Sequence, residues 1–118
     1  TNMINIISSS RYRLSRKKLK TKAGELLQAM GETPDKVINI VFIGKNKMRQ
    51  LASTYKNENV ALPVLSFAYK DEKLDDESLI GELFICYPQA VLLAAERNRR
   101  VEETILSLIK HGLENLFK

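Results

Sequence analysis

The sequence is poor in the residues that build metal centres and disulfides. Its 118 residues include one histidine, one cysteine and no tryptophan. A single cysteine excludes a disulfide within the chain. Cys86 lies in an apolar run that predicts a strand, so we expect a core residue and a reducing, cytoplasmic location. One histidine cannot by itself supply a catalytic zinc centre, which needs about three protein ligands.

Long hydrophobic segments are also missing. No apolar run approaches the roughly 20 residues that span a bilayer, so we expect no membrane partner. The short run Ile4–Ile7 is too brief for a signal-peptide core, and the positive charges follow it instead of preceding it. We interpret it as a first strand. The content of 44% hydrophobic and 28% charged residues is typical of one soluble domain spanning 1–118.

Positive charge is concentrated near the start of the sequence. The net charge is +5, and residues 1–22 hold seven basic side chains and no acidic one. The other 96 residues hold twelve basic and fourteen acidic side chains. Such a cluster is typical of proteins that bind phosphate backbones, although a lysine-rich solvated helix has the same composition. The candidate RNA-binding residues are Arg11, Arg13, Arg16, Lys17, Lys18, Lys20 and Lys22.

The apolar pattern predicts an alternation of strands and helices. Runs rich in β-branched residues predict strands near Ile4–Ile7 and at 37–43, 64–69 and 79–87. Helical periodicity predicts helices between and after them, the first capped by Ser15 and the second by Asn46. A charged turn is expected at 70–77. The order β-α-β-α-β-β-α-α predicts an α/β (α+β) fold, a mixed sheet of about four strands with helices packed on it.

The last expected helix carries the one histidine. His111, Glu114 and Asn115 are spaced i, i+3 and i+4, so they share one helical face. Metal-binding pairs on helices use this spacing, but a lone histidine on an amphipathic helix is more often a surface or capping residue. Gly112 costs about 1 kcal/mol relative to alanine within a helix, which indicates close packing or access to a site beside it. Gly81, within a strand, indicates a bulge or a close backbone approach.

Five segments of the sequence form a recognisable series that covers nearly the whole chain. They are VINIVFIG at 37–44, MRQLASTY at 48–55, VLSF at 64–67, IGELFIC at 80–86 and the helix at 106–116. In this order and with nearly the family's spacing, they resemble the YbeY family, the bacterial rRNA-maturation endoribonucleases. The resemblance implies a metal-dependent endoribonuclease that cuts single-stranded RNA, with zinc as its metal and ribosomal RNA or the small ribosomal subunit as its partner.

The sequence departs from the family's pattern at functional positions. The family binds one metal through three histidines in the motif HxxxHxxxxxH. His111 matches the first, Asn115 stands at the second, and the third would lie beyond Lys118, so we expect a YbeY-like domain with a truncated C-terminal motif. Lys56 replaces the family's arginine, keeping the charge but losing the bidentate fork. Glu82 replaces the family's aspartate, and these last two residues are the candidate catalytic groups.

Two readings stay open. In the first, the protein is an endoribonuclease in which His111 holds the metal and Lys56 stabilises phosphate charge. Because a neutral Asn115 is a poor zinc ligand, His111 with Glu114 could instead hold Mg²⁺ or Mn²⁺ weakly, completed by RNA phosphate. In the second, the protein is a non-catalytic RNA- or ribosome-binding relative that has lost the three-histidine centre and holds no metal. The sequence leaves the oligomeric state open.

Overall fold

The computed structural model describes residues 3–32, 37–69 and 79–118, and within these ranges it contains four strands and four helices. Their order confirms the one expected from the sequence, while the expected turn at 70–77 lies outside the described residues. In chain order the elements are β1 (Met3–Ile7), α1 (Arg16–Ala29), β2 (Val37–Ile43), α2 (Lys45–Lys56), β3 (Val64–Ala68), β4 (Leu79–Cys86), α3 (Tyr87–Glu96) and α4 (Val101–Leu116).

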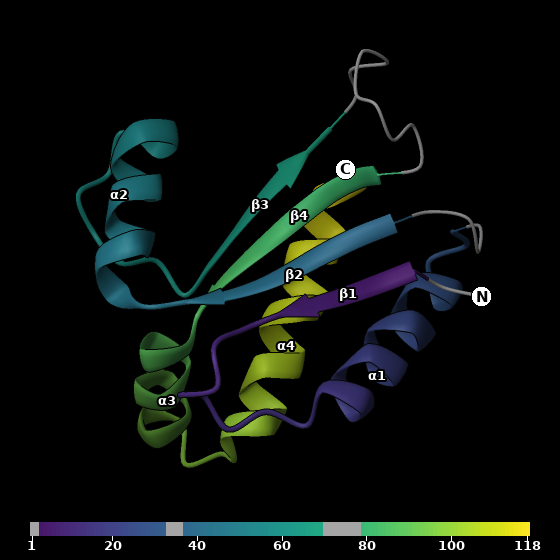
Figure 1. Cartoon of the computed structure of the whole chain (residues 1–118), viewed down its shortest axis with the longest axis horizontal. Coiled ribbons are helices and arrows are strands. Elements are labelled where there is room, and N and C mark those ends of the chain that lie inside the picture. The colour runs from purple at the N-terminus through teal and green to yellow at the C-terminus, as the bar shows by residue number, and fades with distance from the viewer. Residues whose placement is uncertain (1–2, 33–36, 70–78) are drawn as a thin grey trace.

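The strands form one mixed sheet in the order β1-β2-β4-β3 (Figure 1). The first three strands of that order run parallel, and β3 pairs antiparallel with β4. The internal position of β2 explains its nearly continuous apolar sequence, because it is flanked by strands on both sides. The mixed sheet with packed helices confirms the expected fold class. Strands β1 and β3 form the two edges.

Helices cover the two faces of the sheet unequally. The main core lies between one face and helices α1 and α4, where Ile38, Leu83 and Leu113 are fully buried. Helix α2 packs on the other face through a smaller cluster of Met48, Leu65 and Cys86. Successive residues of a strand point to opposite faces of the sheet. The residues next to Ile38 and Leu83 therefore point away from α1 and α4. Cys86 is a core residue as expected, and burial raises the pKa of its thiol.

Local details differ from the expectations in two places. Asn46 was expected to cap the second helix, but the N-cap is Gly44, whose extended backbone lets α2 begin at once after the strand. Asn46 lies inside the first turn, where its Oδ1 accepts a hydrogen bond from Arg49. Ser15 does occupy the N-cap of α1, but its side chain makes no capping hydrogen bond.

No helix of the described ranges is both long enough and apolar enough to cross a membrane.

Gly81 occupies an irregular point of the sheet, as expected. Val37 pairs with Leu79 whereas Ile38 pairs with Gly81, so β4 contains one extra residue here. An added Cβ at Gly81 would meet Leu116 of α4 and lie 2.6 Å from the carbonyl oxygen of Phe67. Glycine therefore allows the last turn of α4 and the backbone of β3 to approach β4 closely.

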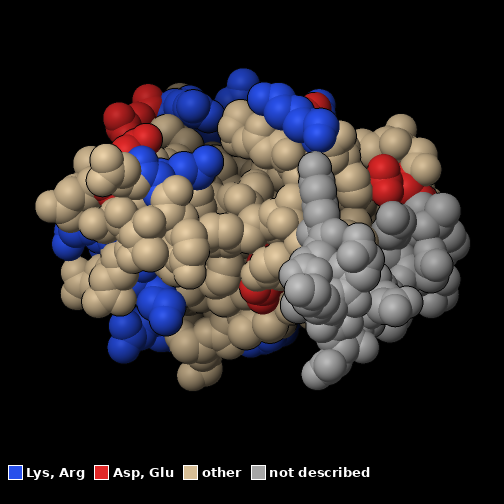
Figure 2. Space-filling view, turned by 90° about the horizontal axis from the view of Figure 1, so that it is seen from above, with Lys and Arg blue, Asp and Glu red and all other residues tan. Residues whose placement is uncertain are grey.

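The basic segment, residues 11–22, lies on α1 and the loop before it, beside the edge strand β1 (Figure 1). Arg16 donates hydrogen bonds to the carbonyl oxygens of Ile6 and Ser8, at 2.8 and 2.7 Å, and so ties β1 to α1. Lys18 pairs with Glu102 at 2.7 Å. These two cations thus have partners within the fold. Figure 2 shows that basic side chains on the face seen from above form several separate groups.

Candidate functional site

A polar pocket of about 440 Å³ opens between α4, the edge strand β3 and the end of α2. We call it the His111 pocket. Its polar lining comes from His111 and Asn115 on α4, Lys56 on α2, Glu58 in the following loop and Ser66 on β3. The structure therefore brings Lys56 together with His111 and Asn115, which lie more than fifty residues further along the sequence.

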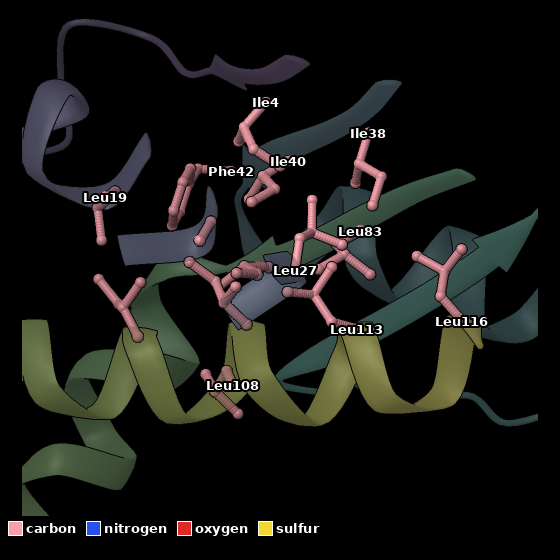
Figure 3. Close-up of a cluster of buried hydrophobic side chains, with 14 of the residues drawn as sticks. Ile4, Leu19, Leu27, Ile38, Ile40, Phe42, Leu83, Leu108, Leu113 and Leu116 are labelled. Carbon is pink, nitrogen blue, oxygen red and sulfur yellow. The ribbon is translucent and has the colours of Figure 1, made fainter. Parts of the chain in front are cut away.

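Close packing of α4 on the sheet positions the histidine side of the pocket. An added Cβ at Gly112 would lie 2.9 Å from Leu83 Cδ2 and 3.3 Å from Ser66 Oγ, which confirms the expected close approach. Figure 3 shows Leu83, Leu113 and Leu116 meeting between the sheet and α4. Ser66 Oγ donates a hydrogen bond of 3.0 Å to the carbonyl oxygen of Gly112. This hydrogen bond occupies the Ser66 proton and fixes α4 against β3 at the residue next to the exposed His111.

The end of α2 positions the cationic side of the pocket. Asn57 adopts the left-handed conformation, with φ 57° and ψ 33°, and ends the helix directly after Lys56. A cation in the last turn also suits the negative end of the helix dipole. The turn brings Glu58 into the pocket lining, a residue that sequence reasoning missed. The one feature of the sequence that could have identified Glu58 is its position just beyond the expected end of the second helix.

The donor set of the pocket does not fit a three-histidine zinc site. The pocket offers one imidazole from His111, one carboxylate from Glu58 and one neutral amide from Asn115. Glu114 is exposed on α4 but does not line the pocket. In the part of the chain that the structure describes, no group of three or more His, Cys, Asp or Glu side chains could hold a metal ion.

The structure does not bring Glu82 into this pocket. Leu83 faces α4, so Glu82 points to the opposite face of the sheet. There Tyr69 Oη donates a hydrogen bond of 2.5 Å to Glu82 Oε1, and Asn39 Nδ2 donates one of 3.2 Å to Oε2. Asn5 Nδ2 donates to Asn39 Oδ1 at 2.9 Å. These contacts join three strand residues and Tyr69, which directly follows β3, in a row across the sheet. The catalytic role of Glu82 stays a prediction.

The Tyr69–Glu82 bond predicts a loss of stability in alkali. Burial, and next the hydrogen bond to Glu82, raise the pKa of Tyr69 from 10.0 to about 12. Between about pH 10 and 12 the unfolded chain loses this proton while the folded chain keeps it, so the free energy of unfolding falls as pH rises. We expect Tyr69→Phe to cost about 1 kcal/mol at neutral pH. Urea unfolding across this pH window should then show a shallower decline than in the intact protein.

The matched control for Tyr69 is Tyr55→Phe, which removes an exposed hydroxyl from α2. This variant should keep most of the alkaline decline, because the charge on Tyr55 is the smallest of the influences that raise the pKa of Tyr69. An equal pH dependence in the two variants would contradict the assignment to Tyr69.

The basic segment and the His111 pocket lie toward opposite edges of the sheet. The segment lies beside β1, and the pocket is lined by β3. Arg11, Arg13, Lys17, Lys20 and Lys22 are exposed, but the structure does not bring them to His111. Their role in RNA binding therefore stays a prediction, separate from the chemistry of the pocket.

The comparison with known proteins decides the family. A family model described as "Endoribonuclease YbeY" matches residues 5–116. The chain belongs to the YbeY family. Similar YbeY family proteins include the Endoribonuclease YbeY of Phytoplasma australiense, 35% identical over 82 residues that make up 67% of this chain and 56% of the relative. The one from Finegoldia magna is 29% identical over 79 residues, 67% of this chain and 52% of the relative.

Longer alignments within the YbeY family have lower identity. The Endoribonuclease YbeY of Thermodesulfovibrio yellowstonii is 24% identical over an alignment of 127 positions, which covers 96% of this chain and 80% of the relative. A solution structure of a Thermotoga maritima protein has a TM-score of 0.60 at 22% identity, over 97% of this chain and 71% of that chain. This likeness shows the fold. The chain spans about half the length of the first two relatives.

Several YbeY-like segments surround the His111 pocket. The helix segment at 48–55 ends beside Lys56, and the strand segment at 64–67 carries Ser66. The strand segment at 80–86 contains Gly81, against which α4 packs. Of these segments, the strand at 64–67 and the helix at 106–116 contribute residues to the pocket lining.

Proposed function

We propose that this YbeY family protein is a ribosomal RNA maturation factor that binds single-stranded RNA at the His111 pocket. One observation carries the proposal: Lys56 of α2 and His111 of α4 line the same solvent-open polar pocket. A flexible ammonium beside an imidazole suits an RNA phosphodiester, because phosphate contacts supply most of the affinity of such complexes. Ribosomal RNA or the small ribosomal subunit is the proposed partner, and the cytoplasm the proposed location.

The pocket residues have separate tasks in this proposal. The Lys56 ammonium neutralises phosphate charge, including the charge that grows during cleavage. The His111 imidazole holds or moves a proton at the ribose or the leaving oxygen. The Asn115 amide both donates and accepts hydrogen bonds, which suits a ribose hydroxyl. Together these groups support the first candidate, an endoribonuclease of single-stranded ribosomal RNA.

A second candidate is a non-catalytic RNA- or ribosome-binding factor. The observation that favours it is the donor set of the pocket, which has one imidazole where the family resemblance implies three. Asn115 is a weak ligand for zinc, and Glu114 does not line the pocket. In this reading Lys56 still binds phosphate, but RNA remains uncut.

The test is an RNA cleavage assay with matched variants. Purified protein is incubated with a single-stranded ribosomal RNA fragment, with EDTA or with added Zn²⁺, Mg²⁺ or Mn²⁺. The variants are His111→Ala and Lys56→Gln, and the control is Lys110→Ala, because Lys110 lines a different groove between α1 and α4. The endoribonuclease predicts cleavage that falls by about 10²- to 10⁴-fold in His111→Ala and persists in Lys110→Ala.

Each result of this assay decides between the candidates. Metal-stimulated cleavage lost in His111→Ala supports the enzyme. Salt-sensitive RNA binding without cleavage, weakened in Lys56→Gln, supports the binding factor. A protein that neither cuts nor binds RNA contradicts both candidates.

A further inference from the structure

Helix α2 presents a second basic surface, and this one leads to the His111 pocket. Four of its twelve residues are basic and none is acidic. Lys45, Lys47, Arg49 and Lys56 are all exposed. The two ion pairs within the described ranges join α4 to α1 and to the turn before α4, so neither neutralises a cation of α2. The positive charge of α2 is therefore available to an external anion.

Two of these cations are placed unfavourably for the helix itself. Lys45 and Lys47 lie in the first turn, which contains no acidic residue. Cations at this end of a helix face the positive end of its dipole, an unfavourable arrangement. The arrangement becomes favourable when a polyanion lies along the helix.

The outer side of α2 is hollowed and rich in hydrogen-bonding groups. A shallow groove of about 450 Å³ runs there, and its lining has amide, hydroxyl and guanidinium groups but no carboxylate. Such groups bind phosphate and sugar oxygens without regard to sequence. The lining residues are Asn46, Arg49, Gln50, Ser53, Thr54 and Asn59.

An exposed aromatic ring stands at the pocket end of the same helix. Tyr55 is 62% exposed. Its ring meets Phe67 edge to face, with centroids 5.0 Å apart and planes at 77°. Phe67 in turn meets Phe84 at 5.5 Å and 83°. These contacts hold the Tyr55 ring in place while most of it faces solvent, as in stacking platforms for bases.

We propose that the outer face of α2 binds the backbone of single-stranded RNA and that Tyr55 stacks on a base of the strand whose phosphate enters the His111 pocket. The inference rests on the proposed RNA function and names its binding surface. Lys56 connects the two regions, because it ends α2 and lines the pocket. The helical part of the basic segment has no such connection, since α1 lies by the other edge of the sheet, although Arg11 in the loop before it lines a hollow together with Lys47 of α2.

The first experiment compares two variants that remove equal charge. One is Lys45→Gln/Lys47→Gln/Arg49→Gln on α2. The other is Lys17→Gln/Lys20→Gln/Lys22→Gln on α1, which tests the competing basic segment. Fluorescence anisotropy with a short labelled single-stranded RNA gives the affinity at several salt concentrations. Each phosphate contact to a single strand contributes about 0.7 to the slope of log K against log salt, so the α2 variant should lose about 2 in slope. The α1 variant should keep the slope of the intact protein, which would exclude these three lysines from the bound surface.

The second experiment tests the ring. Tyr55→Leu should weaken binding by about tenfold and reduce the quenching of a 2-aminopurine base in the RNA, while Tyr55→Phe should keep both. Equal losses of slope in the two charge variants, or a loss confined to α1, would overturn the proposal while leaving RNA binding intact. Unchanged binding by Tyr55→Leu would overturn the stacking role. If the intact protein binds no RNA, the proposed function fails together with this surface.

Discussion

Replacing Gly81 with alanine is expected to destabilise the protein by about 3 kcal/mol, the upper part of the usual range for an overfilled core. The new Cβ would meet two partners of different stiffness. The Leu116 side chain can rotate away, but the carbonyl oxygen of Phe67, 2.6 Å distant, belongs to the backbone of β3. Because β3 is hydrogen-bonded to β4 at this point, the strand must shift to make room. Urea unfolding would measure the loss.

Gly44→Ala provides the matched control. An added Cβ at Gly44 meets only the Tyr12 hydroxyl, at 3.3 Å, and its φ of −88° is open to any residue. A cost below about 1 kcal/mol is expected there, since that side-chain terminus can give way. Gly81→Ala should also weaken RNA binding, because β3 and Leu116 both border the His111 pocket. Equal stabilities of the two variants would show that β3 and α4 do not approach β4 this closely.

The order of elements was predictable because its signals are local. The β-branched run Val37–Ile43 has the composition of an internal strand, and the structure places β2 inside the sheet. Gly31 marks the end of α1 in the sequence, and in the structure it has a positive φ of 80°, which glycine tolerates best. The prediction that Asn46 caps α2 was wrong, because neighbouring residues as well as the preference of asparagine for N-caps decide where the helix begins. Gly44 sits two residues earlier, at the strand end, and takes the cap position first.

The site was less predictable because it depends on which face each helix covers. Lys56 was selected through the family resemblance, and His111 through its helical spacing with Glu114 and Asn115 as well as through that resemblance. No spacing in the sequence shows that Lys56 and His111 meet. Glu82 was placed correctly in a strand, but nothing local indicates that α4 covers Leu83 and leaves Glu82 on the other face. The charge pattern of the sequence indicated residues 11–22 as a basic cluster. It did not indicate α2, because the four cations of that helix are interspersed with neutral residues. Sheet order, which the sequence left open, places α1 by β1 at one edge and the His111 pocket by β3 at the other.

Met48→Ala is expected to cost about 3 kcal/mol, within the range of 2 to 5 kcal/mol for truncating a buried methionine. Helix α2 has two buried residues, Met48 and Ala52, and Met48 is fully buried against Leu65 and Cys86. Met48 is therefore the one large side chain of α2 that is fully buried against the sheet. Leu51→Ala, which truncates a half-buried residue of the same helix, should cost distinctly less.

The consequence should be local as well as global, because the main core between the sheet and α4 does not include Met48. We expect the amides of α2 to exchange faster with deuterium in Met48→Ala, while those of α4 keep more of their protection. The one cysteine reports the same event, since Cys86 is fully buried beneath α2 and should react with a thiol reagent much faster once the helix loosens. Slow labelling of Cys86 and unchanged exchange in α2 would show that other contacts hold the helix. Fast labelling together with weakened RNA binding would connect the packing of Met48 to the position of Lys56 and to the basic face that α2 presents.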